Sequence, residues 1–240
     1  MKTLTKGAVC LTAAILFALL TSTLVLAKKP ASGNYELFGD AALVSPGFNS
    51  PTAAQIRSDG TIPPNYGGVD FGIPAGLTVA DLDNLGAAYM FTAGSCGGGS
   101  PRFQLNVDTG SGIKNIFVYV GPPPNYTGCP PSVWTNTGNL VSPISAVDAT
   151  QLGGAYYMPW AAVQTAYGSY PIVGIQVVND SYWFAGTQTT LFDNVQINNA
   201  TFTFENADSC KKNGWMQFTA APGPFKNQGQ CVSYFAKGGQ

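Results

Sequence analysis

Carboxylates are the acid–base groups that this sequence offers for chemistry. The chain has 12 Asp and Glu residues and no His. Without His it can form neither a Ser-His-Asp nor a Cys-His nucleophile system. A glycoside hydrolase needs one carboxylic acid and one carboxylate at a set separation, and the nearest pair, Asp81 and Asp83, is explained more simply as loop or turn residues. The residue types therefore favour a non-catalytic protein over a carboxylate-dependent glycoside hydrolase.

The polar and aromatic residues that could bind a ligand form two groups. Residues 102–108 (RFQLNVD) alternate, so that Arg102, Gln104, Asn106 and Asp108 share the face opposite the apolar residues. Trp183 lies in a loop rich in Asn, Asp, Gly and aromatic residues. Sugars use aromatic faces together with amide and carboxylate hydrogen bonds. The two groups predict a carbohydrate site, although the strip could equally be an ordinary solvated sheet face and Trp183 a loop-to-core anchor.

The cysteines indicate disulfide bonds. Cys10 falls within an N-terminal apolar run, which leaves Cys96, Cys129, Cys210 and Cys231. An even number of cysteines in an exported chain implies disulfides, and four cysteines allow three connectivities. The simplest one joins sequence neighbours, Cys96–Cys129 and Cys210–Cys231. A zinc site is the alternative, but the chain lacks both Cys-x-x-Cys spacing and His.

The N-terminus predicts a secreted, extracellular protein. Residues 1–27 combine Lys2 and Lys6 with an apolar run and a small residue, Ala27, as a cleaved signal peptide does. No later run is long enough to span a bilayer. The net charge is −1 and no basic patch is present, which argues against nucleic acid as a partner.

The elements that position these residues are predicted to be short strands. Residues 172–178 are rich in β-branched side chains, residues 189–197 and 201–204 alternate, and residues 102–108 and 113–120 form a hairpin. The one convincing helix covers residues 159–167, and the alternating segments 215–218 and 231–235 suggest a disulfide-stapled C-terminal hairpin. We expect an all-β fold, a two-sheet antiparallel sandwich, with a domain at 28–207 and the hairpin at 208–240 packed on it.

Two resemblances add to this interpretation. The segments CKKNGW and PFKNQGQCVS in the tail, with GSCGGGSPRFQ, YVGPPPNYTGCPP and TLFDNVQIN in the body, resemble a family of secreted bacterial proteins of uncharacterised function. More loosely, LFDNVQI (residues 191–197) is similar to the closing strand of jelly-roll carbohydrate-binding modules. In those modules an early acidic residue and a late Asp share a structural calcium. The matching residues here are Glu36 and Asp193, although Asp193 could instead cap a turn or accept bonds from the backbone.

Taken together, these features predict a secreted binding module for a polysaccharide or a cell-surface glycan. A structural or adhesive surface protein without a small ligand is the alternative, because low charge, many Gly, Asn and Thr residues and two disulfides fit that class as well.

Overall fold

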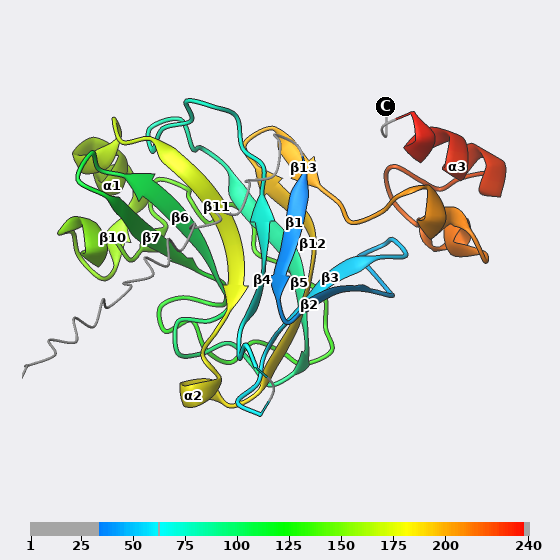
Figure 1. The fold of residues 1–240 in the computed structure, drawn as a ribbon, viewed down its shortest axis with the longest axis horizontal. Helices are drawn as coiled ribbons and strands as arrows, with labels where there is room; N and C mark the ends of the chain where they lie inside the picture. The colour runs from blue at the N-terminus through cyan, green and yellow to red at the C-terminus, as the bar shows by residue number, and fades with distance from the viewer. Residues whose placement is uncertain (1–33, 62, 238–240) are drawn as a thin grey trace, which may run out of the picture.

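The computed structural model describes residues 34–61 and 63–237 (Figure 1). The predicted signal peptide, residues 1–27, lies outside the described residues. None of the helices in the described ranges is long and apolar enough to cross a membrane.

The first sheet is antiparallel and has five strands in the order β1-β4-β11-β6-β7. Its strands are β1 (Tyr35–Gly39), β4 (Gly67–Phe71), β6 (Arg102–Asp108), β7 (Ile113–Tyr119) and β11 (Ile172–Asn179). The β6–β7 hairpin predicted from the sequence is present, with Gln104 opposite Phe117. β11 lies at the centre of the sheet because its β-branched side chains are buried there.

The second sheet is antiparallel and contains six strands. Five run in the order β2-β3-β12-β5-β8, and β13 pairs with β12. They are β2 (Ala41–Val44), β3 (Ala53–Ser58), β5 (Leu85–Ala93), β8 (Thr135–Asn136), β12 (Gln188–Ile197) and β13 (Ala200–Phe202). A small ribbon, β9 (Ala146–Val147) with β10 (Met158–Pro159), completes the strands of the described residues.

One hydrophobic core contains side chains from both sheets. The ring of Phe103 on β6 lies 6.5 Å from that of Phe192 on β12, and the ring of Tyr89 on β5 packs on Phe192 from within the second sheet. The strand pairing in both sheets confirms a predominantly β, antiparallel fold. The finer assignment to a jelly-roll sandwich stays a prediction.

The face to which Phe192 belongs differs from the sequence expectation. Strict alternation would place Phe192 with Asn194 and Gln196, away from Val195, but Phe192 and Val195 both join the core. The pairing of β12 with β5 shifts between Asp193 and Gln196, and Asn194 has φ 47°. This irregularity reverses the alternation within the strand.

Helices are more numerous than the sequence predicted. The expected helix is present as α1 (Trp160–Tyr167), with Trp160 in the core and its Nε1 donating to the carbonyl of Leu82. Two further α-helices are α2 (Tyr182–Ala185) and α3 (Gln228–Ala236), and short 3-10 turns are η1 (Thr150–Leu152), η2 (Ala207–Cys210) and η3 (Gly214–Gln217). The prediction of a single short helix is therefore wrong.

The C-terminal segment is helical, which corrects the predicted hairpin. η2, η3 and α3 surround a small cluster of their own, in which Phe218 and Phe225 pack on the disulfide. Asn227 caps α3 by accepting from the backbone NH of Gln230. Figure 1 shows this orange-to-red segment standing beside the β body. The short alternation in residues 231–235 predicts a strand, but the N-cap at Asn227 favours a helix, and the helix is what forms.

Both predicted disulfides are confirmed. Cys96–Cys129 lies in the main core, and Cys210–Cys231 joins η2 to α3. The first bond holds the glycine-rich loop after β5 against the loop before β8. Gly121 (φ 130°) passes so close to both sulfurs that a Cβ there would lie 2.9 Å from the Sγ of Cys96.

Candidate functional site

The predicted polar strip lies on the face of the first sheet that points away from the core. Arg102, Gln104, Asn106 and Asp108 are half-buried, whereas the residues between them on β6 are fully buried. Cross-strand pairing places Gln176 of β11 opposite Gln104, and Asp70 of β4 opposite Gln176. The strip is therefore one part of a polar face that spans several strands.

A chain of hydrogen bonds crosses this face from a cation to an anion. Arg102 Nη2 donates to Gln104 Oε1 over 3.4 Å, and Gln104 Nε2 donates to Gln176 Oε1 over 3.3 Å. Gln176 Nε2 then donates to Asp70 Oδ1 over 2.5 Å. Because a guanidinium only donates and a carboxylate only accepts, the two ends fix the orientation of both amides.

Arg102 also anchors the loop that carries Trp183. Its two Nη atoms lie 2.6 and 2.7 Å from the carboxylate oxygens of Asp180, a bidentate pair. Its guanidinium covers the ring of Phe117 at 4.7 Å. Both Nη atoms of Arg102 are therefore engaged by the protein itself, and they hold other groups of this face in place.

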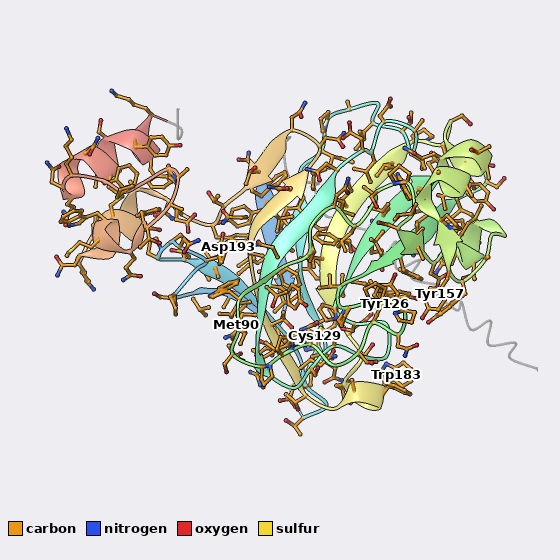
Figure 2. The ribbon with its side chains drawn as sticks, turned by 180° about the vertical axis from the view of Figure 1, so that it is seen from behind. Met90, Tyr126, Cys129, Tyr157, Trp183 and Asp193 are labelled. Carbon is orange, nitrogen blue, oxygen red and sulfur yellow. A yellow bond between two sulfur atoms is a disulfide. The ribbon has the colours of Figure 1, made fainter. Side chains whose placement is uncertain are left out.

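Trp183 is held in solvent, as a ligand platform would be. Its side chain is 72% exposed and that of its neighbour Phe184 is 69% exposed. Both lie on α2, where the hydroxyl of the preceding Ser181 donates to the carbonyl of Gly98. Figure 2 shows Trp183 at the end of the β body, far from Asp193. The alternative of a loop-to-core anchor is wrong.

A cluster of four tyrosines, missed in the sequence analysis, lies beside the same sheet. Tyr119 on β7 contacts the rings of Tyr126 and Tyr156, and Tyr157 contacts both of these in turn. Tyr119 donates to Asp148 Oδ2 over 2.8 Å, and burial, with this carboxylate, raises the pKa of Tyr119. Tyr156 and Tyr157 are 52% and 44% exposed. Figure 2 shows Tyr126 and Tyr157 close together. The adjacent YY at 156–157 was the available signal.

The structure does not bring Glu36 and Asp193 together. Glu36 is exposed on β1 in the first sheet, opposite Asp70. Asp193 is fully buried on β12 in the second sheet. The two residues are therefore not placed to share a calcium ion. In the described ranges, no group of three or more His, Cys, Asp or Glu residues is arranged to hold a metal.

The acidic neighbour of Asp193 is Glu205. Asp193 Oδ2 accepts from the backbone NH of Phe48 and from the Ser50 hydroxyl, and its Oδ1 accepts from the NH of Asn194. Burial first, and the Glu205 carboxylate second, raise the pKa of Asp193 to about 7. Burial also raises the pKa of Glu205, whose Oε1 is buried without a hydrogen-bond partner. The pair is suited to holding a proton.

The loop that Asp193 organises also carries the C-terminal segment. Thr219 donates its backbone NH to Asn49 O over 3.0 Å and its hydroxyl to Asn49 Oδ1 over 3.2 Å. The hydroxyls of Thr52 and Ser209 lie 3.1 Å apart. Residues 47–52 thus connect the buried carboxylates to the helical tail.

Two hollows lie where β4 ends and β11 begins, at the other end of β11 from α2. One, of about 490 Å³, is lined by Ile73, Pro74 and Phe202 among others. The other, of about 280 Å³, shares Ile73 and Pro74 and reaches Gly174. Their linings are mainly apolar, and none of the residues discussed for sugar binding lines them.

Comparisons with protein-family models, with curated proteins and with solved structures found no match. The functional interpretation therefore depends on the geometry of this chain alone.

Proposed function

We propose that the protein is an extracellular, non-catalytic module that binds carbohydrate. The observation that carries the proposal is the pair of adjacent aromatic side chains on α2, Trp183 and Phe184, at 72% and 69% exposure. Large aromatic residues contribute little to folding when exposed, whereas the C–H faces of a sugar ring pack well on a flat aromatic surface.

The aromatic pair is pre-organised, which lowers the entropic cost of binding. The bidentate contact of Asp180 with Arg102 fixes the chain just before α2. Gly98 (φ 62°) passes so close to Phe184 that a Cβ there would lie 2.8 Å from its ring. Trp183 itself stays exposed on this fixed helix.

The polar strip supplies the second kind of contact. Gln104 Nε2 donates a hydrogen bond to Asn106 Oδ1 over 3.2 Å, on the same sheet face as Arg102. Asp108 follows on the same strand. A ligand lying on this face would meet amide and carboxylate groups whose positions are already set. A two-sheet jelly-roll sandwich, the fold expected from the sequence, would present such a face to solvent.

Secretion is part of the proposal. Two disulfides and the absence of a membrane-spanning helix in the described residues are consistent with it. A cell-surface glycan or an extracellular polysaccharide would then be the natural ligand.

Affinity electrophoresis through gels that contain single neutral polysaccharides tests the proposal. We expect the wild type to be retarded by at least one of them and Trp183→Ala to migrate freely. Ile144→Ala is the matched control, because Ile144 is 89% exposed and is not part of α2 or of the strip. If no polysaccharide retards the wild type, a structural or adhesive role is favoured. Release of reducing ends would instead indicate a hydrolase.

A further inference from the structure

We propose that the aromatic pair on α2 and the tyrosine cluster beside β7 form one aromatic surface, which binds an extended, uncharged, β-1,4-linked glycan. The surface consists of Tyr119, Tyr126, Tyr156, Tyr157, Trp183 and Phe184. This inference rests on the proposed carbohydrate binding and adds the class of glycan. Its basis is the glycine loop, residues 97–99, which contacts both aromatic groups.

The glycine loop brings the two aromatic groups next to each other. A Cβ on Gly98 would lie 2.8 Å from the ring of Phe184, and a Cβ on Gly99 would lie 3.3 Å from the ring of Tyr119. Because Gly98 and Gly99 are consecutive, the two rings flank the same short stretch of backbone. Gly98 is exposed and Gly99 is half-buried. Without side chains at these positions, the backbone between the aromatic groups stays open to a ligand.

Hydrogen bonds fix the glycine loop to α2. Arg102 Nη1 donates to the carbonyl of Gly99 over 3.3 Å, while the same guanidinium forms the ion pair with Asp180. The hydroxyl of Ser181, directly before α2, donates to the carbonyl of Gly98 over 2.7 Å. The glycine loop and the helix that carries Trp183 are therefore held together before a ligand binds.

The tyrosine cluster is fixed to the same loop. The disulfide Cys96–Cys129 joins the residue before the glycine loop to the segment that carries Tyr126. Tyr126 has φ 52°, which is uncommon outside Gly, Asn and Asp, and its hydroxyl donates to the carbonyl of Ala146 over 3.0 Å. A backbone conformation of this kind persists only where the surroundings hold it. Pre-organisation of both aromatic groups lowers the entropic cost of binding a long ligand.

The charged side chains next to these rings are matched within the protein. The buried carboxylate of Asp148 accepts from the hydroxyl of Tyr119 through Oδ2, and from the backbone NH and the hydroxyl of Thr150 through Oδ1. Asp180 is paired with Arg102. The surface thus offers aromatic rings and glycine backbone, a composition that favours an uncharged sugar chain over an ammonium, carboxylated or sulfated one.

The exposed residues lie at the two ends of the aromatic surface, which favours a long chain. Trp183 and Phe184 form one end, and Tyr156 and Tyr157, about half exposed, form the other. Figure 2 shows Trp183 and Tyr157 on the same side of the β body. A disaccharide covers one end only, whereas an extended chain contacts both. β-1,4-linked pyranoses form such extended ribbons with C–H faces, and α-1,4-linked chains coil.

Calorimetric titration with β-1,4-linked glucose oligosaccharides of two, four and six units tests the inference. We expect the affinity to rise about tenfold between the disaccharide and the hexasaccharide, as one or two additional aromatic contacts would allow. The α-1,4-linked glucose hexasaccharide should bind more weakly than its β-linked counterpart. Affinity that does not rise with length, or equal binding of the α-linked chain, overturns the inference.

The double variant Tyr156→Ala/Tyr157→Ala distinguishes the two ends. It should weaken binding of the β-linked hexasaccharide by about three- to tenfold and leave disaccharide binding at Trp183 unchanged. Tyr66→Ala is the matched control, because Tyr66 is 43% exposed, as Tyr157 is at 44%, and packs beside Phe38 of β1, at the opposite edge of the sheet from β7. The control should keep the dependence on length. Melting temperatures of both variants verify folding.

The outcomes separate this inference from the proposed function. If the folded double variant binds the hexasaccharide as the wild type does, the inference is overturned while carbohydrate binding stands. The same holds if a polysaccharide gel retards the protein but none of the β-1,4-linked oligosaccharides binds. If neither a polysaccharide nor an oligosaccharide binds, the proposed function itself fails.

Discussion

Arg102 on β6 and Asp70 on β4 are linked through the side-chain amides of Gln104 and Gln176, across the strand that separates them. Arg102 donates to the amide oxygen of Gln104, and Asp70 accepts from the amide nitrogen of Gln176. The charged residue at each end therefore sets the orientation of the amide beside it. The face is thus fixed before any ligand arrives, and its polarity is set by residues that are far apart in the sequence.

Replacing Gln176 tests this chain. Gln176→Glu replaces the amide that donates to Asp70 with a second carboxylate directly opposite it, so we expect a greater loss of stability at neutral pH than in acid. Gln176→Leu removes the same donor without a charge and should cost about 1–2 kcal/mol at either pH. Urea denaturation at both pH values measures this. Gln196→Glu is the control, because exposed Gln196 only accepts, from Asn84. Equal pH dependence in Gln176→Glu and the wild type would contradict the account.

The two tryptophans Trp183 and Trp160 should respond oppositely to truncation. Trp160 is 1% exposed and lies in the core, so Trp160→Ala should cost about 3–5 kcal/mol of unfolding free energy. Trp183→Ala should leave the unfolding free energy within about 0.5 kcal/mol of the wild type. Denaturant titration of both variants provides the comparison. A loss of several kcal/mol in Trp183→Ala would show that its ring packs against the protein.

Stability should fall as the pH rises between about 5 and 7. The folded-state pKa of Asp193 is about 7, above the ordinary value, so the folded state binds a proton that the unfolded state has released. One such proton gives a slope of up to about 1.4 kcal/mol per pH unit. The raised pKa of Glu205 acts in the same direction, whereas the lowered pKa values of Asp59 and Asp81 act at lower pH. Asp193→Asn should flatten the slope, measured by denaturation across this range.

A chelator distinguishes whether Asp193 and Glu205 share a proton or a calcium ion. If Asp193 and Glu205 hold a proton, adding chelator at pH 6 should leave the melting temperature unchanged. If they hold calcium, the chelator should lower the melting temperature, and added calcium should restore it. Glu205→Gln provides a second check. A neutral amide can take the place of a protonated carboxyl group, whereas its loss of charge would weaken a calcium site.

The disulfide Cys210–Cys231 should stabilise the C-terminal helices alone. Their cluster is small and separate from the main core, and segments below about 40 residues usually depend on disulfides or other cross-links. Replacing both cysteines with Ala should abolish hydrogen-exchange protection in α3 while the β-strands keep theirs. Replacing Cys96 and Cys129 with Ala should instead lower the global stability, by about 2–5 kcal/mol. Unchanged protection in α3 would contradict the prediction.

The sequence by itself determined the features that depend on local patterns. β-branched density predicted β11, period-two alternation predicted the two faces of β6, and Pro before and Gly after residues 160–167 marked α1. Neighbouring cysteines also gave the correct pairing. The strands and the helix were predictable because their patterns lie within a few residues. The disulfides were predictable because each cysteine pairs with its nearest neighbour in the sequence.

Only the tertiary structure decided which distant residues meet. Glu205 rather than Glu36 lies beside Asp193, and Gln176 and Asp70 extend across the neighbouring strands the polar face of which β6 revealed only one strand. Strand order and register are set by how the sheets bury their apolar faces, and this cannot be deduced from the period of one strand. Tertiary packing also overrode local alternation at two places. Core packing around Phe192 accompanies the irregularity at Asn194, and packing around the Cys210–Cys231 disulfide accompanies the helical tail.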